Sequence, residues 1–282
     1  MSFAIVVDST ADLTVEEYRN NRVAMVPLTI EVGGGEYKDQ TEITSEEFYD
    51  RMVAASELPK TAAPAPYDFV QTYNRLADEG YDHIISLHIA SVLSGTVESA
   101  RLAASQVDVP VTVLDTAGAT VSLALLALKA CEMRDAGISA EEAVEALSRY
   151  IKDFKVVIAC DTLENLLKGG RLSADQVKNA SLLNIKPEFT FDERGVLIAY
   201  DKAKGMNGVI KNYTKEIKKR TEELGVQEVR FCHTRNLGAV EELRSQLKEA
   251  GIEYIDKGQA TCGATAAAHL GLGAVGIACL TH

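Results

Sequence analysis

Hydrophobic and polar positions follow two different patterns along this chain of 282 residues. Short apolar runs rich in β-branched residues predict buried strands at 3–7, 83–89, 110–114, 155–159, 228–232 and 274–280. Apolar residues repeat with helical spacing between these runs, which predicts amphipathic helices at 67–79, 97–107, 120–136, 140–153, 207–224 and 238–250. Helix starts are also marked by a hydroxyl residue followed three positions later by Glu, at Thr14/Glu17, Thr44/Glu47 and Ser139/Glu142.

The order of these segments contains two strand–helix–strand units. One runs through 83–89, 97–107 and 110–114, and the other through 227–233, 238–250 and 252–256. Units of this kind build parallel sheets through right-handed crossovers, so the pattern predicts an α/β fold.

The length of the chain favours two lobes, because a single core usually stops growing near this size. A segment of different character, rich in Lys, Gly and Asn, lies at 161–206. We place an N-terminal α/β lobe with a parallel sheet at 1–155 and a second α/β lobe at 156–282. No low-complexity linker separates them, so they should pack closely and form a ligand site at their seam.

The formal net charge of −12 argues against nucleic acid as a partner and against steady residence on an anionic membrane surface. Basic residues gather within 202–220. That cluster is either a solvated helix face or a docking patch for a protein partner. It comprises Lys202, Lys204, Lys211, Lys215, Lys218, Lys219 and Arg220.

The five cysteines are scattered and lack CxxC spacing, which is typical of a reduced, intracellular protein and not of a zinc site. The N-terminus has neither the basic nor the long apolar region of a signal peptide, so we expect a cytoplasmic protein. Residues 261–280 carry no formal charge, but their glycines and alanines favour a small-residue loop followed by a buried strand over a membrane span.

A loop rich in hydroxyl groups follows the predicted strand 83–89 and opens the next helix. It contains Ser91, Ser94, Gly95 and Thr96. Hydroxyls and free N–H groups at a helix start can bind an anion, although an ordinary helix cap with a Gly turn would use the same residues.

Two further loops could contribute to an anion site. Three of the six prolines surround Thr61, so this hydroxyl sits on stiff backbone, as in a preformed site or a plain connector. In the second loop, Gly170 allows close approach of the backbone and Arg171 could bind a carboxylate or phosphate. A helix C-cap with a charged surface loop explains that stretch equally well.

Candidate ligand contacts also occur near both ends of the chain. His269 and Gly271 could form a ligand mouth, but a lone His in an apolar stretch is commonly a hydrogen-bonded core residue. Asp8, Ser9 and Thr10 directly follow the first strand, where ligands of parallel sheets bind and where Asx-type turns also form.

Common catalytic motifs are missing from the sequence. We find no G-x-S-x-G elbow, no G-x-G-x-x-G after a strand and no pair of metal ligands at helical spacing. The remaining chemistry consists of hydroxyl donors, one or two cations and apolar lining, which suits holding an acid better than breaking a bond.

These segments, taken in order, resemble the DegV family of bacterial fatty-acid-binding proteins. The resemblance runs from end to end. It rests on Asp8-Ser9-Thr10, Lys60-Thr61, Leu93-Ser94-Gly95-Thr96 with Glu98-Ser99-Ala100, Asp115-Thr116, Leu163 to Ser173, Leu183-Asn184-Ile185-Lys186-Pro187, His233 and His269-x-Gly271-x-Gly273-Ala274.

The resemblance implies a two-lobed fold that holds one long-chain fatty acid such as palmitate. It places the carboxylate on Thr61 and Ser94, with Thr96, Arg171 and His269 near the head group. The supporting loop positions are Ser9, Ser91, Gly95, Gly170 and Gly271. It implies a carrier that is not an enzyme, uses no cofactor or metal, and presents its ligand to a separate fatty acid kinase.

The chain departs from the family pattern in three places. Ala62 stands where relatives often have Ser, Leu270 stands where they have Thr, and Lys202 or Lys204 replaces a usual Arg. Two other functions stay open on the sequence. They are a phosphotransfer enzyme like dihydroxyacetone kinase, with His269 or His233 linked to substrate, and a binder of another small lipid-like acid. We expect a monomer, because no heptad repeat or interface stripe is present.

Overall fold

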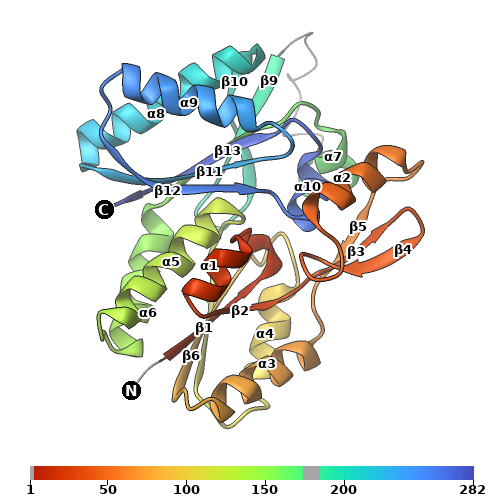
Figure 1. Ribbon diagram of the computed structural model, residues 1–282, viewed down its shortest axis with the longest axis vertical. Helices are drawn as coiled ribbons and strands as arrows, with labels where there is room; N and C mark the ends of the chain where they lie inside the picture. Colours follow the sequence, from red (N-terminus) through yellow and green to blue (C-terminus); the bar gives the residue numbers. More distant parts are fainter. Residues whose placement is uncertain (1–2, 174–184) are drawn as a thin grey trace.

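The computed structural model describes residues 3–173 and 185–282 and contains three β-sheets with helices on their faces (Figure 1). One sheet has four strands, one has six and one has three. This architecture confirms the predicted α/β class. Leu183 and Asn184, which belong to the resemblance described above, lie outside the described residues.

The four-stranded sheet is parallel and has the order β2-β1-β6-β7. Its strands are β1 (Phe3–Asp8), β2 (Val23–Val26), β6 (His83–His88) and β7 (Val111–Asp115). Apolar side chains project from both faces of β1 and β6, since helices cover both faces of the sheet. Helices α3 (Pro66–Asp78) and α4 (Thr96–Ala104) cover one face, and α5 (Val121–Asp135) and α6 (Ala140–Asp153) cover the other.

The capping residues define helix starts as the sequence predicts, with one difference. Both halves of the capping box form at α1 (Val15–Asn20) and at α6. At α2 (Ser45–Ala54), Thr44 Oγ1 accepts a hydrogen bond from Glu47 N at 3.2 Å. Glu47 does not complete the box, because its carboxylate instead pairs with Arg51 one turn later at 2.8 Å.

The three-stranded sheet is antiparallel and has the order β4-β3-β5. Its strands are β3 (Thr29–Val32), β4 (Gly35–Lys38) and β5 (Lys60–Ala62). It packs through Ile30 and Val32 against α2 and α10 (Ala264–Leu270). These strands were not predicted from the sequence, because they are too short to show a clear period of two.

The six-stranded sheet has the order β10-β9-β8-β13-β11-β12. Its strands are β8 (Lys155–Ala159), β9 (Ile185–Phe191), β10 (Leu197–Lys204), β11 (Gln227–His233), β12 (Tyr254–Thr261) and β13 (Val275–Thr281). Strands β11 and β12 are parallel and are joined by α9 (Leu237–Glu249), which confirms the second strand–helix–strand unit. The other neighbours are antiparallel, and α8 (Gly205–Leu224) packs with α9 over one face.

Two stretches differ from the sequence prediction. The uncharged segment 261–280 contains α10 where we predicted a loop, although β13 follows as predicted. The Lys- and Gly-rich segment 161–206 contains α7 (Glu164–Lys168) and the β9–β10 hairpin. Within the described ranges, no helix combines the length and apolar character needed to cross a bilayer.

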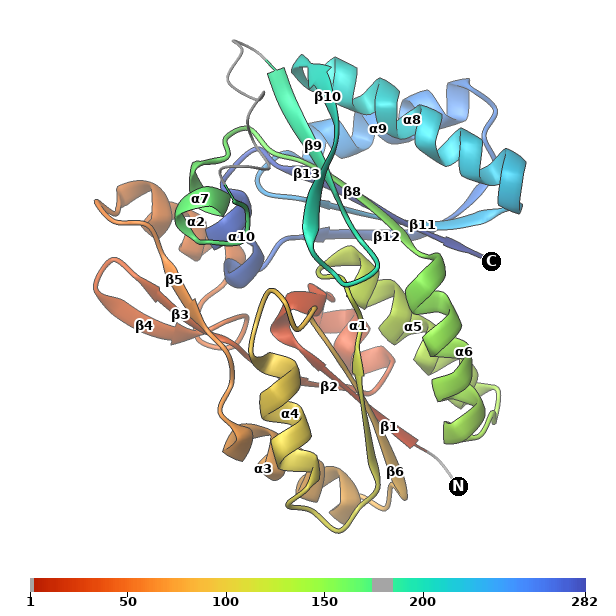
Figure 2. The same cartoon turned by 180° about the vertical axis from the view of Figure 1, so that it is seen from behind.

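Helix α5 lies between the two large sheets, in contact with β1 and β6 on one side and with β8, β11, β12 and β13 on the other (Figures 1 and 2). Ion pairs cross the same layer. Lys129 of α5 binds Glu228 of β11 at 2.5 Å, and Lys257 of β12 binds Glu132 of α5 at 2.5 Å. We propose that the two lobes divide where β8 begins, close to residue 155.

A buried arginine connects the six-stranded sheet to α1. Arg230 of β11 is fully buried, and both of its terminal nitrogens donate to the carboxylate of Glu17 in α1 at 2.7 Å. Although burial raises the pKa of Glu17, the hydrogen bonds and charge of Arg230 lower it overall. The carboxylate therefore stays ionised and compensates a charge that water does not reach.

Replacing this carboxylate should destabilise the protein strongly. Glu17→Gln leaves the Arg230 charge buried without a counter-ion, so we expect the free energy of unfolding to fall by about 3 kcal/mol. Glu16→Gln is the matched control, because Glu16 is exposed on the same helix turn, and it should change stability by less than about 0.5 kcal/mol. Urea denaturation of both variants tests this, and equal losses would contradict a special role for the Arg230–Glu17 pair.

Candidate functional site

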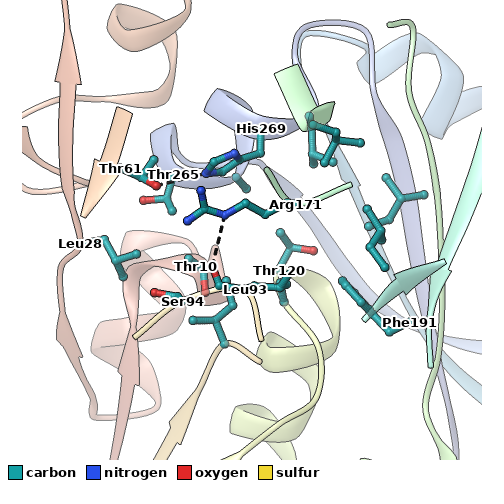
Figure 3. A pocket seen from close by; sticks show the side chains of 17 residues that line it. Thr10, Leu28, Thr61, Leu93, Ser94, Thr120, Arg171, Phe191, Thr265 and His269 are labelled. Atoms are coloured by element: carbon teal, nitrogen blue, oxygen red, sulfur yellow. Dashed lines mark hydrogen bonds between the residues drawn. The ribbon is translucent and has the colours of Figure 1, made fainter. Parts of the chain in front are cut away.

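A cavity of about 70 Å³ lies between the two large sheets (Figure 3). Residues of the six-stranded sheet, the small sheet, α7 and α10 enclose it, together with the segments that follow the strands of the four-stranded sheet. Its apolar walls include Leu28, Ile89, Leu93, Ile158, Leu166, Phe191, Leu197 and Leu270, and its polar lining comprises Thr10, Thr61, Ser94, Thr120, Arg171, Thr265 and His269. The cavity is thus an apolar space with polar groups gathered mainly at one end.

The polar end contains a hydrogen bond between β5 and α10. Thr61 Oγ1 lies 3.1 Å from His269 Nε2, and His269 Nδ1 is buried without a partner among the described residues. Gly169 permits this position, because a Cβ at residue 169 would lie 2.6 Å from Nδ1. Burial, with a smaller effect from Arg171, lowers the pKa of His269 to about 4, so the imidazole is neutral near pH 7.

Arg171 extends across the cavity from the turn after α7 (Figure 3). Its Nε donates to the backbone oxygen of Leu93 at 3.2 Å, and its Nη1 donates to the oxygen of Gly169 at 2.7 Å. The first bond connects the turn after α7 to the loop that carries Ser94. Burial lowers the pKa of Arg171, but a guanidinium stays protonated at neutral pH. Arg171 is therefore the cation of this site.

Ser94 reaches the cavity from the loop before α4. Its Oγ lies 2.8 Å from the Oγ1 of Thr96, the first residue of that helix. Thr96 is fully buried and is not one of the described lining residues. It therefore orients the Ser94 hydroxyl from behind.

The carboxylate of Asp39, which follows β4, fixes the start of α10. It accepts hydrogen bonds from Ala264 N at 2.9 Å, Thr265 N at 3.2 Å, Thr265 Oγ1 at 2.6 Å and Ser9 Oγ at 3.0 Å. Burial raises the pKa of Asp39, while the bonds from Thr265 and Ser9 oppose that increase. Asp39 thereby holds the helix that carries both Thr265 and His269.

A second buried carboxylate lies behind Thr10. Asp8 accepts bonds from the N and Oγ1 of Thr10 and pairs with His88 Nδ1 at 3.1 Å. His88 Nε2 bonds to Ser86 Oγ at 2.7 Å, and this hydroxyl also bonds to Tyr73 at 2.8 Å. Asp8, His88 and Ser86 are the residue types of a hydrolase triad, yet Ser86 is fully buried and does not line the cavity. The chain of bonds orients Thr10.

The predicted site residues occupy three kinds of position. Thr61, Ser94, Arg171 and His269 line the cavity together. Ser9 and Thr96 lie behind it and bond to Asp39 and Ser94. The other predicted positions are absent from the described lining. Ser91 is exposed and bonds through its N–H to Asp115, Gly95 and Gly271 cap α4 and α10, and Gly170 follows α7 at a φ of +72°.

Thr120 and Thr265 were not selected from the sequence as ligand contacts. Thr10 was named there either as a ligand contact after the first strand or as part of a turn, and it lines the cavity. Thr265 lies in the uncharged stretch that we interpreted as a loop, so we did not predict that it lies in the first turn of a helix. Thr120 precedes α5 and has the pattern of an ordinary helix cap. No group of three or more His, Cys, Asp or Glu suited to a metal occurs in residues 3–173 and 185–282.

Comparison with known proteins gives consistent matches along the whole chain. The family model described as "Uncharacterised protein, DegV family" matches residues 2–282. A DegV domain-containing protein of Deinococcus radiodurans is 34% identical over 281 residues, which is 99% of this chain and 98% of that protein. A structure described as showing fatty acid binding by a DegV family protein of Thermus thermophilus has a TM-score of 0.92 and 33% identity, with 100% of both chains covered.

A third match bears on partners. The Fatty Acid Kinase (Fak) B3 protein of Streptococcus pneumoniae, whose structure was solved loaded with linoleic acid, has a TM-score of 0.86 and 25% identity, with 100% of both chains covered.

The neutral state of His269 can be measured directly. In a proton NMR titration, the imidazole signal that is missing from the spectrum of His269→Gln should titrate near pH 4. The unfolded chain takes up this proton near pH 6.5. The contribution of His269 to stability is therefore present above pH 6.5 and is lost as the pH falls from 6.5 to 4. A midpoint at pH 6 or above would contradict the burial argument.

Proposed function

The chain belongs to the DegV family, and from that premise we propose that it binds a single long-chain fatty acid in the cavity between its sheets. The carboxylate binds at Thr61 and Ser94, and the tail lies along the apolar walls. The observation that carries this proposal is the cavity itself, which is apolar along most of its lining and has hydroxyls, an imidazole and a guanidinium at one end.

The head-group chemistry fits an ionised acid. A carboxylate buried without partners is very costly, so several donors must converge on it. Thr61 and Ser94 supply hydroxyls, and Arg171 supplies the positive charge. Since His269 is neutral at pH 7, the charge of the site balances with one carboxylate and one guanidinium.

The tail supplies most of the affinity. About 15 methylenes at about 0.8 kcal/mol each set an upper limit of about 12 kcal/mol on the transfer free energy of the tail. Association and ordering costs of at least about 4 kcal/mol reduce this value. The cavity of about 70 Å³ is smaller than the roughly 300 Å³ of a typical ligand site, so a long acyl chain binds only after the cavity widens.

We further propose that the chain is a carrier and that a separate fatty acid kinase phosphorylates its ligand. The description of the pneumococcal relative as a fatty acid kinase B protein supports this role. Lys202, Lys204 and Lys211 are exposed on β10 and α8 and offer a positive contact on a chain of net charge −12. The carrier would act in the cytoplasm and without a cofactor.

The ligand should be visible in the purified protein. Native mass spectrometry should show one bound long-chain acid per chain, or stoichiometric uptake of added palmitate. A clean unliganded mass that palmitate does not change would refute the proposed function. Extraction of a different small acid would favour the broader binding role, and a covalent adduct on a histidine would favour the phosphotransfer alternative.

Removing either head-group hydroxyl should weaken binding without unfolding the protein. We expect Thr61→Ala and Ser94→Ala each to raise the Kd for palmitate about 10-fold, because a hydrogen bond to a charged group is lost while the tail contacts remain. Ser91→Ala is the matched control, since Ser91 is in the same loop but is exposed and does not line the cavity. Unchanged palmitate affinity in both variants would show that the carboxylate binds elsewhere.

A further inference from the structure

One polar side chain in the cavity stands apart from the head-group residues. Thr120 lies between Leu93 and Phe191, on the side where the apolar walls begin (Figure 3). Its side chain is 3% exposed, and Oγ1 has no hydrogen-bond partner within the described residues. A buried hydroxyl without a partner costs about 1–3 kcal/mol, so its presence in an apolar wall needs an explanation.

Helix capping does not explain Thr120. It occupies the N-cap position of α5, where a threonine hydroxyl usually accepts a hydrogen bond from the first turn of the helix. No such bond forms here. The hydroxyl makes no hydrogen bond to α5. The backbone oxygen of Thr120 does, because it accepts the bond from Ala124 N at 2.9 Å.

The backbone at Thr120 is also unfavourable. Its φ of +53° and ψ of −121° lie outside the regions that a β-branched residue normally adopts. Such a conformation costs about 1–3 kcal/mol and persists where the surroundings impose it. Here the turn of the β9–β10 hairpin packs tightly on the same loop, since a Cβ at Gly195 would lie 3.0 Å from the Cα of Ala117. Two unfavourable features therefore coincide at one lining residue.

Neither the protein interior nor water satisfies this hydroxyl well. The thiol of Cys232 interacts with this hydroxyl, but a thiol is a weak hydrogen-bond partner, and Oγ1 has no partner of good geometry within the described residues. A water molecule needs two to four polar partners, whereas the wall beside Thr120 is formed by the apolar side chains of Leu93 and Phe191. An oxygen attached to the ligand needs no such set of partners, because the acyl chain holds it in place.

We propose that the cavity is selective for a fatty acid that carries a hydroxyl group near its carboxyl end, and that Thr120 is the residue that recognises this hydroxyl. The inference rests on the proposed function, because Thr61, Ser94 and Arg171 must first fix the carboxylate. Thr120 lines the same cavity of about 70 Å³ as Thr61, Ser94 and Arg171, so the hydroxyl that it binds is expected near the carboxyl end and not at the far end of the tail.

The test compares ligands that differ only in this group. Isothermal titration of the delipidated full chain with 3-hydroxyhexadecanoate, 16-hydroxyhexadecanoate and hexadecanoate should show the 3-hydroxy acid binding about 3- to 10-fold more tightly than hexadecanoate. One enantiomer of the 3-hydroxy acid should account for the gain, because a hydrogen bond to a fixed side chain is directional. The 16-hydroxy acid should show no gain.

Two variants connect the preference to Thr120. Thr120→Val keeps the shape and the branched Cβ but removes the hydroxyl, so it should bind hexadecanoate at least as well as the wild type and lose the preference. Thr120→Ser keeps the hydroxyl and should retain the preference. Thermal melting of both variants shows that they are folded.

The possible outcomes separate the two claims. Equal affinity of the wild type for the 3-hydroxy acid and hexadecanoate would overturn the inference and leave the proposed function intact. A preference that survives in Thr120→Val would also overturn it, because another group would then hold the hydroxyl. Failure of all three acids to bind the wild type would refute the proposed function and the inference with it.

Discussion

The arrangement of the site depends on the buried carboxylate of Asp39. It follows the small sheet, yet it binds Ser9 after the first strand and the first turn of α10 near the end of the chain. A carboxylate at a helix start satisfies N–H groups that the helix cannot satisfy itself. Because α10 carries His269 and packs on the small sheet that carries Thr61, the distance between these two side chains follows from this anchor.

The two buried carboxylates also decide which groups can donate to a ligand. Thr10 and Thr265 line the cavity, but their hydroxyl hydrogens are given to Asp8 and Asp39. They therefore present oxygen lone pairs to the cavity. Apart from the hydroxyl of Thr120, the side-chain donors that remain for an anion in the described lining are those of Thr61, Ser94 and Arg171. The polar end therefore has hydrogen-bond acceptors at some positions and donors at others, with no second positive charge among the described lining residues.

The sequence predicted the parts of the fold that have local signals. Strands β1, β6, β8 and β13, the long helices and the two capping boxes at Thr14 and Ser139 follow from periodicity and capping residues. Thr61, Ser94, Arg171 and His269, which line one cavity, were selected through hydroxyl-rich loops and the family resemblance. Helix α10 and the role of Asp39 could not be predicted, because each depends on hydrogen bonds across more than 220 positions of the chain. Thr120 was missed for another reason, since its unusual backbone has no sequence signature.

The apolar walls of the cavity are continuous with the hydrophobic core between α5 and the six-stranded sheet. Ile158, Leu166, Leu197 and Leu270 belong at once to the cavity lining and to one cluster of buried side chains that also includes Phe189 and Val156. A molecule between these walls would be packed as an interior residue is packed. The free energy of ligand binding would then add to the free energy of unfolding. Occupancy would raise the melting temperature, and a core substitution far from any head group would change affinity. The ligand would thus fill a space in the hydrophobic core that the side chains of the protein do not fill.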